Sequence, residues 1–377
     1  MRELEFSFRL CTFARNFEDM KNLTVLFLLL SIITLQNCSN PEVVNKTESA
    51  HINYFDNTGR DDILSGGVKM IPISTPVGNF NVWTKRTGNN PTVKVLLLHG
   101  GPGANHMYLE AFDSYFPGAG IEYYYYDQLG SGYSDIPTDT SLWNIDRFVK
   151  EVEQVRIALN LDESNFYLYG QSWGGILAIE YALKYQQNLK GLIISNMMSS
   201  IPDYDKYANE VLGPQMGADV LKEIKDLEAK GDFNNPRYLE LIETNYYPEH
   251  VLRMPLEKWP EPVNRSFSIL NAQIYVMMQG PSEFGVAGNA TLKDWDRKLD
   301  LKKIITPTLC IGAEFDTMDP EHMKWMAGEF PNGVYLYCPK GSHLSLYDDA
   351  EVYFKGLIQF IKKIDTGDFE RTISSII

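Results

Sequence analysis

Cysteine is scarce in this sequence, and its scarcity argues against stabilisation by a disulfide framework or by a structural zinc site. Only four of the 377 residues are cysteines, and none stands in the paired spacing typical of a structural zinc site. Cys310 and Cys338 lie inside apolar runs that are typical of buried strands, so we expect both to be small core residues. Their positions do not imply a disulfide. With 44% hydrophobic residues, the chain is expected to fold around an ordinary core without a metal.

Runs of positive charge are also missing. The chain has 34 lysines and arginines against 49 aspartates and glutamates, a formal net charge of −15, and its basic residues are not clustered. Nucleic acids and anionic membrane surfaces attract basic patches, so neither is expected as a partner. We interpret the acidic balance as a contribution to solubility.

The apolar stretch near the front of the chain, Leu23–Leu35, is too short to cross a bilayer comfortably. It follows Met20 and one positive charge and is soon followed by Cys38, a combination that resembles a bacterial lipoprotein signal. We therefore expect a true start at Met20 and lipid attachment at Cys38, with export to the cell envelope. Asn37 departs from the small residue usual before such a cysteine, so an uncleaved anchor and a plain secretory signal stay open. In each case residues 1–50 would be leader, signal and tether.

From about residue 68 onward, short β-prone runs alternate with helical periodicity. One helical period follows Asn144, which is suited to cap a helix. The alternation predicts an α/β fold with a mostly parallel, doubly wound sheet covered on both faces. The predicted strands are Val68–Ile73, Phe80–Trp83, Val93–Leu98, Ile121–Tyr126, Phe166–Tyr169, Gly191–Ser195, Thr308–Ile311 and Val334–Cys338.

The alternation breaks between about Met197 and Trp295. This region has helical patches at Val220–Ala229 and Tyr238–Thr244 and no convincing strand. We predict a helical cap, residues 197–296, inserted between two parts of an α/β core, residues 51–196 and 297–377. In an open α/β sheet the chemistry sits at the carboxyl ends of the strands, so the insertion should cover that edge.

One stretch joins a predicted strand to a helical run through a sharp turn that carries a serine. The turn is Gly170-Gln-Ser172-Trp-Gly174, and glycine at its two ends would let strand and helix approach closely. The simpler alternative is a helix start capped by Ser172. We favour a nucleophile elbow with Ser172 as the nucleophile, because two further motifs accompany it.

A serine nucleophile requires a histidine base and an acid that orients the base. Of the six histidines, His343 alone lies in a loop directly after the last predicted strand. The loop after the preceding strand offers Glu314, Asp316 and Asp319. Asp319 precedes a proline, as a helix cap does, and Glu314 lies closer to the strand end. We therefore predict a triad of Ser172, Asp316 and His343, in the chain order of α/β-hydrolases.

Attack on a carbonyl creates an oxyanion that needs preorganised donors. The backbone N–H of Trp173, just after the nucleophile, should be one donor. The run His99-Gly-Gly-Pro-Gly103 should supply the other, and we predict Gly101. Such a run also suits phosphate binding, but no Gly-Lys-Ser/Thr follows it, which argues against a nucleotide site.

With these motifs in place, the chain resembles the proline iminopeptidase family of serine α/β-hydrolases, from about Val68 to Ile361. The Gln-Gly-Pro-x-Glu-Phe motif in the predicted cap resembles the peptidase branch in particular. The resemblance is carried by His99–Gly103, Asp127-Gln-Leu-Gly-Ser-Gly132, Gly170–Gly175, Tyr275, Met278–Phe284, Lys293-Asp-Trp-Asp296, Gly312–Met318 and Gly341-Ser-His343.

The resemblance implies a cofactor-free serine aminopeptidase that removes an N-terminal residue, often proline, from short peptides with a free N-terminus. In the family a glutamate binds the free amino group of the substrate, and Glu283 occupies that position here. Tyr275 matches a tyrosine that lines the amino-end pocket. Some members carry a second acid directly after the catalytic aspartate, where this chain has Thr317. Proline preference and strict exopeptidase action therefore stay open.

Two other hypotheses remain at this point. The same triad would serve an esterase or amidase that acts on small non-peptide substrates. The fold could also belong to a non-catalytic binding protein of the cell envelope, although an intact triad argues against that function. Epoxide hydrolase and dehalogenase chemistry would need a carboxylate in place of Ser172.

Overall fold

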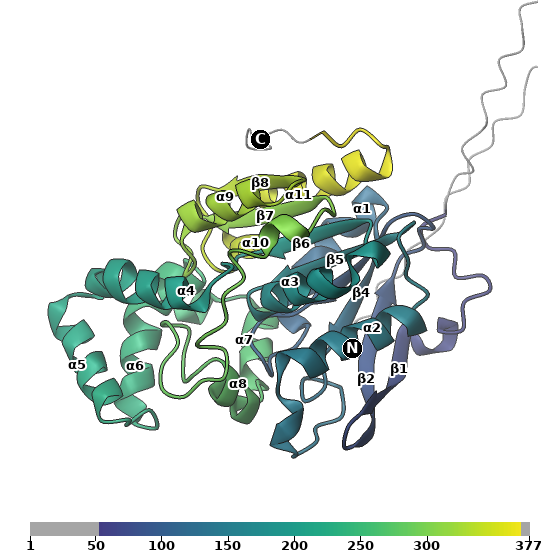
Figure 1. Ribbon diagram of the computed structural model, residues 1–377. Coiled ribbons are helices and arrows are strands. Elements are labelled where there is room, and N and C mark those ends of the chain that lie inside the picture. Colours follow the sequence, from purple (N-terminus) through teal and green to yellow (C-terminus); the bar gives the residue numbers. More distant parts are fainter. Residues whose placement is uncertain (1–52, 371–377) are drawn as a thin grey trace, which may run out of the picture. The chain divides into compact units, whose positions relative to one another are not determined.

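The computed structural model describes residues 53–370, and within them eight strands form one sheet (Figure 1). The predicted start at Met20 and the predicted lipid attachment at Cys38 lie outside the described residues. All eight predicted strands are present, within a few residues of the expected bounds. They are β1 (Val68–Thr75), β2 (Gly78–Thr87), β3 (Lys94–Leu98), β4 (Glu122–Asp127), β5 (Phe166–Gln171), β6 (Gly191–Ser195), β7 (Thr308–Ala313) and β8 (Gly333–Cys338).

The strands follow the order β1-β2-β4-β3-β5-β6-β7-β8 across the sheet. Strands β1, β2 and β4 pair antiparallel, and the six strands from β4 to β8 pair parallel. Every residue of β4, β5 and β6 is buried, which suits strands covered on both faces. The α/β-hydrolase fold predicted from the sequence is therefore confirmed.

Helices with apolar faces pack against the sheet. The helix α2 (Ile145–Ala158) begins as predicted, because the side chain of Asn144 accepts a hydrogen bond from Arg147 N, and it buries Phe148, Val152 and Val155. It packs along α3 (Trp173–Tyr185), while α9 (Pro320–Glu329) and α11 (Ala350–Asp365) pack against β7 and β8. The short helices α1 (Phe116–Ala119) and α10 (Ser345–Asp348) complete this part.

A helical insertion leaves the sheet after β6 and returns at β7 (Figure 1). Its two ends meet, because Ile201 N donates to Trp295 O (2.9 Å) and Arg297 N donates to Ser199 O (2.8 Å). Between residues 196 and 307 the structure places no strand. Both predicted helical patches are present, and the exact cap limits, 197–296, stay a prediction. The helices are α4 (Ile201–Tyr207), α5 (Ala218–Ala229), α6 (Pro236–Asn245), α7 (Glu261–Ser268) and α8 (Ala272–Met278).

Cys310 and Cys338 are buried, unpaired thiols in β7 and β8, as expected of core residues. Within residues 53–370, no helix combines the length and the apolar composition that a membrane span requires.

Candidate active site

Ser172 occupies a sharp turn between β5 and α3. Its backbone has φ 54° and ψ −126°, a conformation that residues other than glycine rarely adopt. The surrounding structure must therefore hold the backbone in this strained conformation. A Cβ on Gly170 would lie 2.0 Å from Gly174 O, and one on Gly174 would lie 2.3 Å from Leu98 O, so only glycine fits at either position. The Ser172 side chain makes no capping hydrogen bond to α3, which contradicts the alternative of a simple helix cap.

Asp316 and His343 form a buried pair. His343 Nδ1 lies 2.8 Å from Asp316 Oδ1, and the exposed fractions are 4% for His343 and 0% for Asp316. Burial alone would lower the pKa of His343, but the Asp316 carboxylate, its hydrogen bond and the charge of Glu283 together outweigh burial and raise this pKa above its ordinary value. With Nδ1 facing Asp316, His343 Nε2 is the nitrogen left to act on a serine.

The other two acids of the β7 loop have different partners. Asp319 caps α9, since its side chain accepts a hydrogen bond from Glu321 N, as the sequence indicated. Glu314 accepts a hydrogen bond from the Tyr337 hydroxyl. Asp316 is therefore the acid of this loop that orients His343.

Ser172 and His343 line the same cavity, which has a volume of about 500 Å³ and is also lined by residues from the insertion. Ser172 is 8% exposed. The neighbouring Gln171 fixes the histidine loop, because its Nε2 donates to the His343 carbonyl (3.0 Å) while its Oε1 accepts from Tyr108 (2.7 Å). Among the five histidines of residues 53–370, only His343 lines this cavity.

Two loops meet beside Ser172 and present backbone donors. A Cβ on Gly100 would lie 2.9 Å from Ser172 Cβ, so the glycine-rich run approaches the nucleophile closely. Gly100 N is already bonded to the Tyr108 hydroxyl (2.6 Å). Gly101 N and Trp173 N, by contrast, donate to no group in the described part of the chain. This leaves both N–H groups able to bind an oxyanion.

Sequence reasoning missed the contacts of three residues with this arrangement. Asn196 has a left-handed backbone (φ 51°), and its amide donates to Asp316 Oδ2 (2.6 Å) and to Ser342 O (3.1 Å). The amide of Gln128 joins the loop of Gly101 to that of Trp173, because it donates to His99 O (3.2 Å) and accepts from the Trp173 indole (2.8 Å). Thr317 Oγ1 lies 3.0 Å from His343 Nδ1. The available signal was position, since Asn196 and Gln128 each follow the end of a strand.

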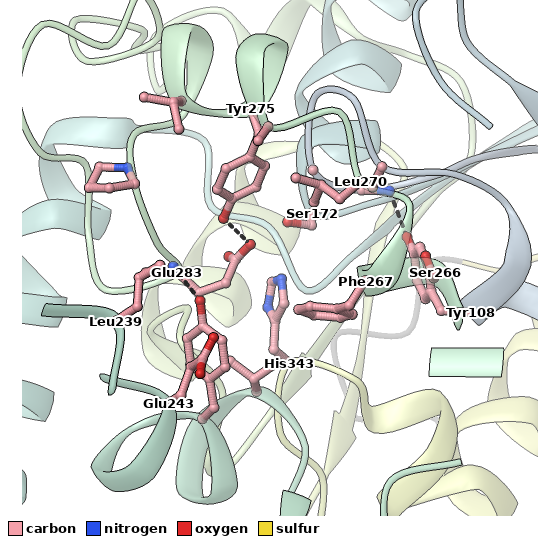
Figure 2. Close-up of a pocket in the computed structure, with 18 of the residues that line it drawn as sticks. Tyr108, Ser172, Leu239, Glu243, Ser266, Phe267, Leu270, Tyr275, Glu283 and His343 are labelled. Carbon is pink, nitrogen blue, oxygen red and sulfur yellow. Dashed lines mark hydrogen bonds between the residues drawn. The ribbon is translucent and has the colours of Figure 1, made fainter. Parts of the chain in front are cut away.

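Glu283 lies in the wall of the cavity that the insertion provides (Figure 2). Its carboxylate accepts a hydrogen bond from the Tyr275 hydroxyl, and its main chain is bonded to Tyr204 (2.7 Å) and Tyr247 (3.4 Å). Burial and the charge of Glu283 raise the pKa of Tyr275 far above its usual range, so the hydroxyl stays protonated and donates. Within residues 53–370, no lysine or arginine lines the cavity, which leaves this carboxylate without a cationic partner there.

In residues 53–370, no three histidine, cysteine, aspartate or glutamate side chains come together in a way that could hold a metal ion.

Comparison with known proteins places this arrangement in a family context. Residues 94–350 match the family model of the alpha/beta hydrolase fold. The chain is 59% identical to the proline iminopeptidase of Elizabethkingia meningoseptica over 300 residues, which is 80% of this chain and 100% of that protein. It is 59% identical to the proline iminopeptidase of Flavobacterium johnsoniae over 78% of this chain and 98% of that protein. The structure of the Mycobacterium smegmatis proline iminopeptidase superposes with a TM-score of 0.70 at 27% identity, covering 80% of this chain and 99% of that one.

Proposed function

Because the chain belongs to the proline iminopeptidase family of the α/β-hydrolases, we propose that it is a serine aminopeptidase that releases an N-terminal proline, or another small apolar residue, from short peptides. One observation carries the proposal: Ser172, His343 and a carboxylate without a cationic partner, Glu283, line one cavity. A hydrolase for neutral esters has no need of that charge, whereas a substrate with an N-terminal ammonium group does.

The substrate enters with its ammonium group at Glu283 and its first carbonyl at Ser172. Tyr275 links the two positions, because its hydroxyl bonds Glu283 and a Cβ on Gly101 would lie 3.4 Å from its ring. About one tyrosine ring therefore separates the carboxylate from the oxyanion loop. With its amine bound at Glu283, a substrate would have room for only one residue before the scissile bond.

Catalysis follows the acyl-enzyme route. His343 Nε2 takes the proton from Ser172 Oγ as the oxygen attacks the carbonyl carbon, and the N–H groups of Gly101 and Trp173 stabilise the oxyanion. When the intermediate collapses, the C–N bond breaks and His343 returns the proton to the leaving amine. A water molecule then attacks the Ser172 ester, again with His343 as the base, and frees the N-terminal residue. Asp316 keeps the imidazole oriented and stabilises its charged form.

A panel of aminoacyl chromogenic substrates, each with and without N-acetylation, tests the proposal. We expect the prolyl substrate with a free amine to be cleaved and its N-acetyl derivative to be left intact. Equal turnover of both would instead favour the esterase or amidase alternative, which needs the triad but no amine anchor.

We also propose that the enzyme is exported and held in the bacterial cell envelope by lipid at Cys38. The support is the sequence alone: a short apolar run after Met20 that ends close to a cysteine. The polar residues between Cys38 and the folded part would then act as a tether.

A further inference from the structure

The cavity has two chemically different sides. Figure 2 shows Glu283, Glu243 and Leu239 on one side of His343, and Phe267 and Leu270 on the other. Within the described residues, the charged side chains that line the cavity are Glu243, Glu283 and His343. The side beyond His343 therefore carries no charged group of its own.

The proposed reaction determines which part of the substrate meets each side. The ammonium group of the substrate binds at Glu283, whereas the leaving nitrogen must come within hydrogen-bond reach of His343 to receive its proton. The chain beyond the scissile bond consequently continues past His343, away from Glu283. On that side the cavity is lined by Phe267 and Leu270.

The wall on this side presents apolar side chains beside the uncharged polar residues Ser266 and Tyr108, and it is held in place. Phe267 is 40% exposed although it lines a cavity, so its ring offers apolar surface to a substrate. It packs edge-to-face on Trp259 with ring centroids 5.6 Å apart, and the Trp259 indole donates to Met254 O (3.1 Å). The neighbouring Ser266 carbonyl accepts from the Asn105 amide (3.0 Å). These contacts fix α7 before any substrate binds.

We propose that Phe267 and Leu270 form the subsite for the residue that follows the scissile bond, and that this subsite selects a large apolar side chain there. The inference rests on the proposed aminopeptidase function and adds a second specificity to it. Burial of a leucine or phenylalanine side chain against the two residues favours the transition state, whereas glycine gains nothing there. A charged side chain would lose its hydration without finding a partner.

The test compares two peptide amides, Pro-Phe-Gly-amide and Pro-Gly-Gly-amide, on the full-length protein. We expect kcat/KM to favour the first by about tenfold or more. Phe267→Ala should reduce that ratio to about two or less. Leu239→Ala is the matched control, because Leu239 is similarly exposed (38%) and lies on the other side of His343, so the ratio should persist. Phe267→Glu provides a second variant, expected to turn the preference toward Pro-Lys-Gly-amide.

Several results would overturn the subsite. Equal cleavage of both peptides by the unaltered enzyme would do so, as would a ratio that survives both Phe267 substitutions. Loss of the ratio in Leu239→Ala but not in Phe267→Ala would place the subsite on the opposite side. Failure to cleave any peptide with a free amine is a separate outcome, because it rejects the proposed function together with this subsite.

Discussion

The hydroxyl of Tyr275 donates a hydrogen bond to the carboxylate of Glu283. The same tyrosine ring lies beside Gly101, whose backbone N–H faces no other partner in the described residues. One side chain thus connects the group that would bind a substrate amine with the loop that would bind the oxyanion. The separation between these two sites therefore suits a substrate whose acyl part is a single amino-acid residue.

Loss of Ser172 or His343, the proposed nucleophile and base, should abolish turnover. Ser172→Ala and His343→Ala should each reduce kcat by on the order of 10⁴-fold or more, because triad members act as a unit. A serine-directed phosphonate should label the unaltered protein and not Ser172→Ala. If the unaltered, folded protein resisted the phosphonate, the non-catalytic binding protein would become the better account.

The two aspartates of the β7 loop offer a matched pair. Asp316→Asn should cost about 10⁴-fold in kcat, because the amide no longer fixes the tautomer of His343. Asp319→Asn should cost little, since asparagine caps a helix as well as aspartate does. A crippled Asp319→Asn enzyme beside a nearly normal Asp316→Asn enzyme would reverse the assignment of the acid.

The pH dependence follows from the raised pKa of His343. The base must be neutral to accept a proton, so kcat/KM should rise with pH through a midpoint above about 6.5, the ordinary value for histidine. Asp316→Asn removes the larger of the two charges that raise this pKa, and it leaves burial, which lowers the pKa, opposed only by the charge of Glu283. An NMR titration of the His343 imidazole should therefore show a lower midpoint in that variant, and an unmoved midpoint would mean that Asp316 is not what raises the pKa.

The predicted lipid anchor can be examined without regard to activity. Mass spectrometry of the membrane fraction should detect a mature N-terminus at Cys38 that carries lipid, and Cys38→Ser should shift the protein to the soluble fraction. An unmodified protein that begins elsewhere and is soluble would reject the anchor and leave the enzyme unaffected.

The sequence predicted what local pattern encodes. Strand periodicity and the glycines at 170 and 174 indicated the sheet and the elbow, because a turn this tight excludes every other residue at those positions. The motifs also brought Asp316 and His343 together, but the contacts that support this pair from other loops were beyond such reasoning. The amide of Asn196 meets Asp316 across 120 positions of sequence, and Gln128 meets Trp173 across 45. Nothing beside either residue in the sequence reports that pairing, which depends on how neighbouring strands end.

The wall opposite Glu283 was likewise invisible in the sequence. The sequence around Phe267 indicates only a helical insertion. The place of Phe267 in the cavity depends on how α7 packs against the 3₁₀ segment Met107–Ser114, which carries Tyr108. Tertiary packing decides such a position, whereas periodicity reports only that an amphipathic helix is present.

The central claim, that the half-buried carboxylate of Glu283 selects a free amine, is tested most directly by Glu283→Gln. This change keeps the shape of the side chain and removes its charge. The variant should lose the equivalent of about 2–5 kcal/mol in kcat/KM on a prolyl peptide and hydrolyse a simple acyl ester nearly as before. Glu243→Gln is the control, because Glu243 lines the same cavity but is exposed, and it should lose much less on the peptide. Equal losses by Glu283→Gln on peptide and ester would contradict the account, since Glu283 would then support the fold or the triad rather than bind the amine.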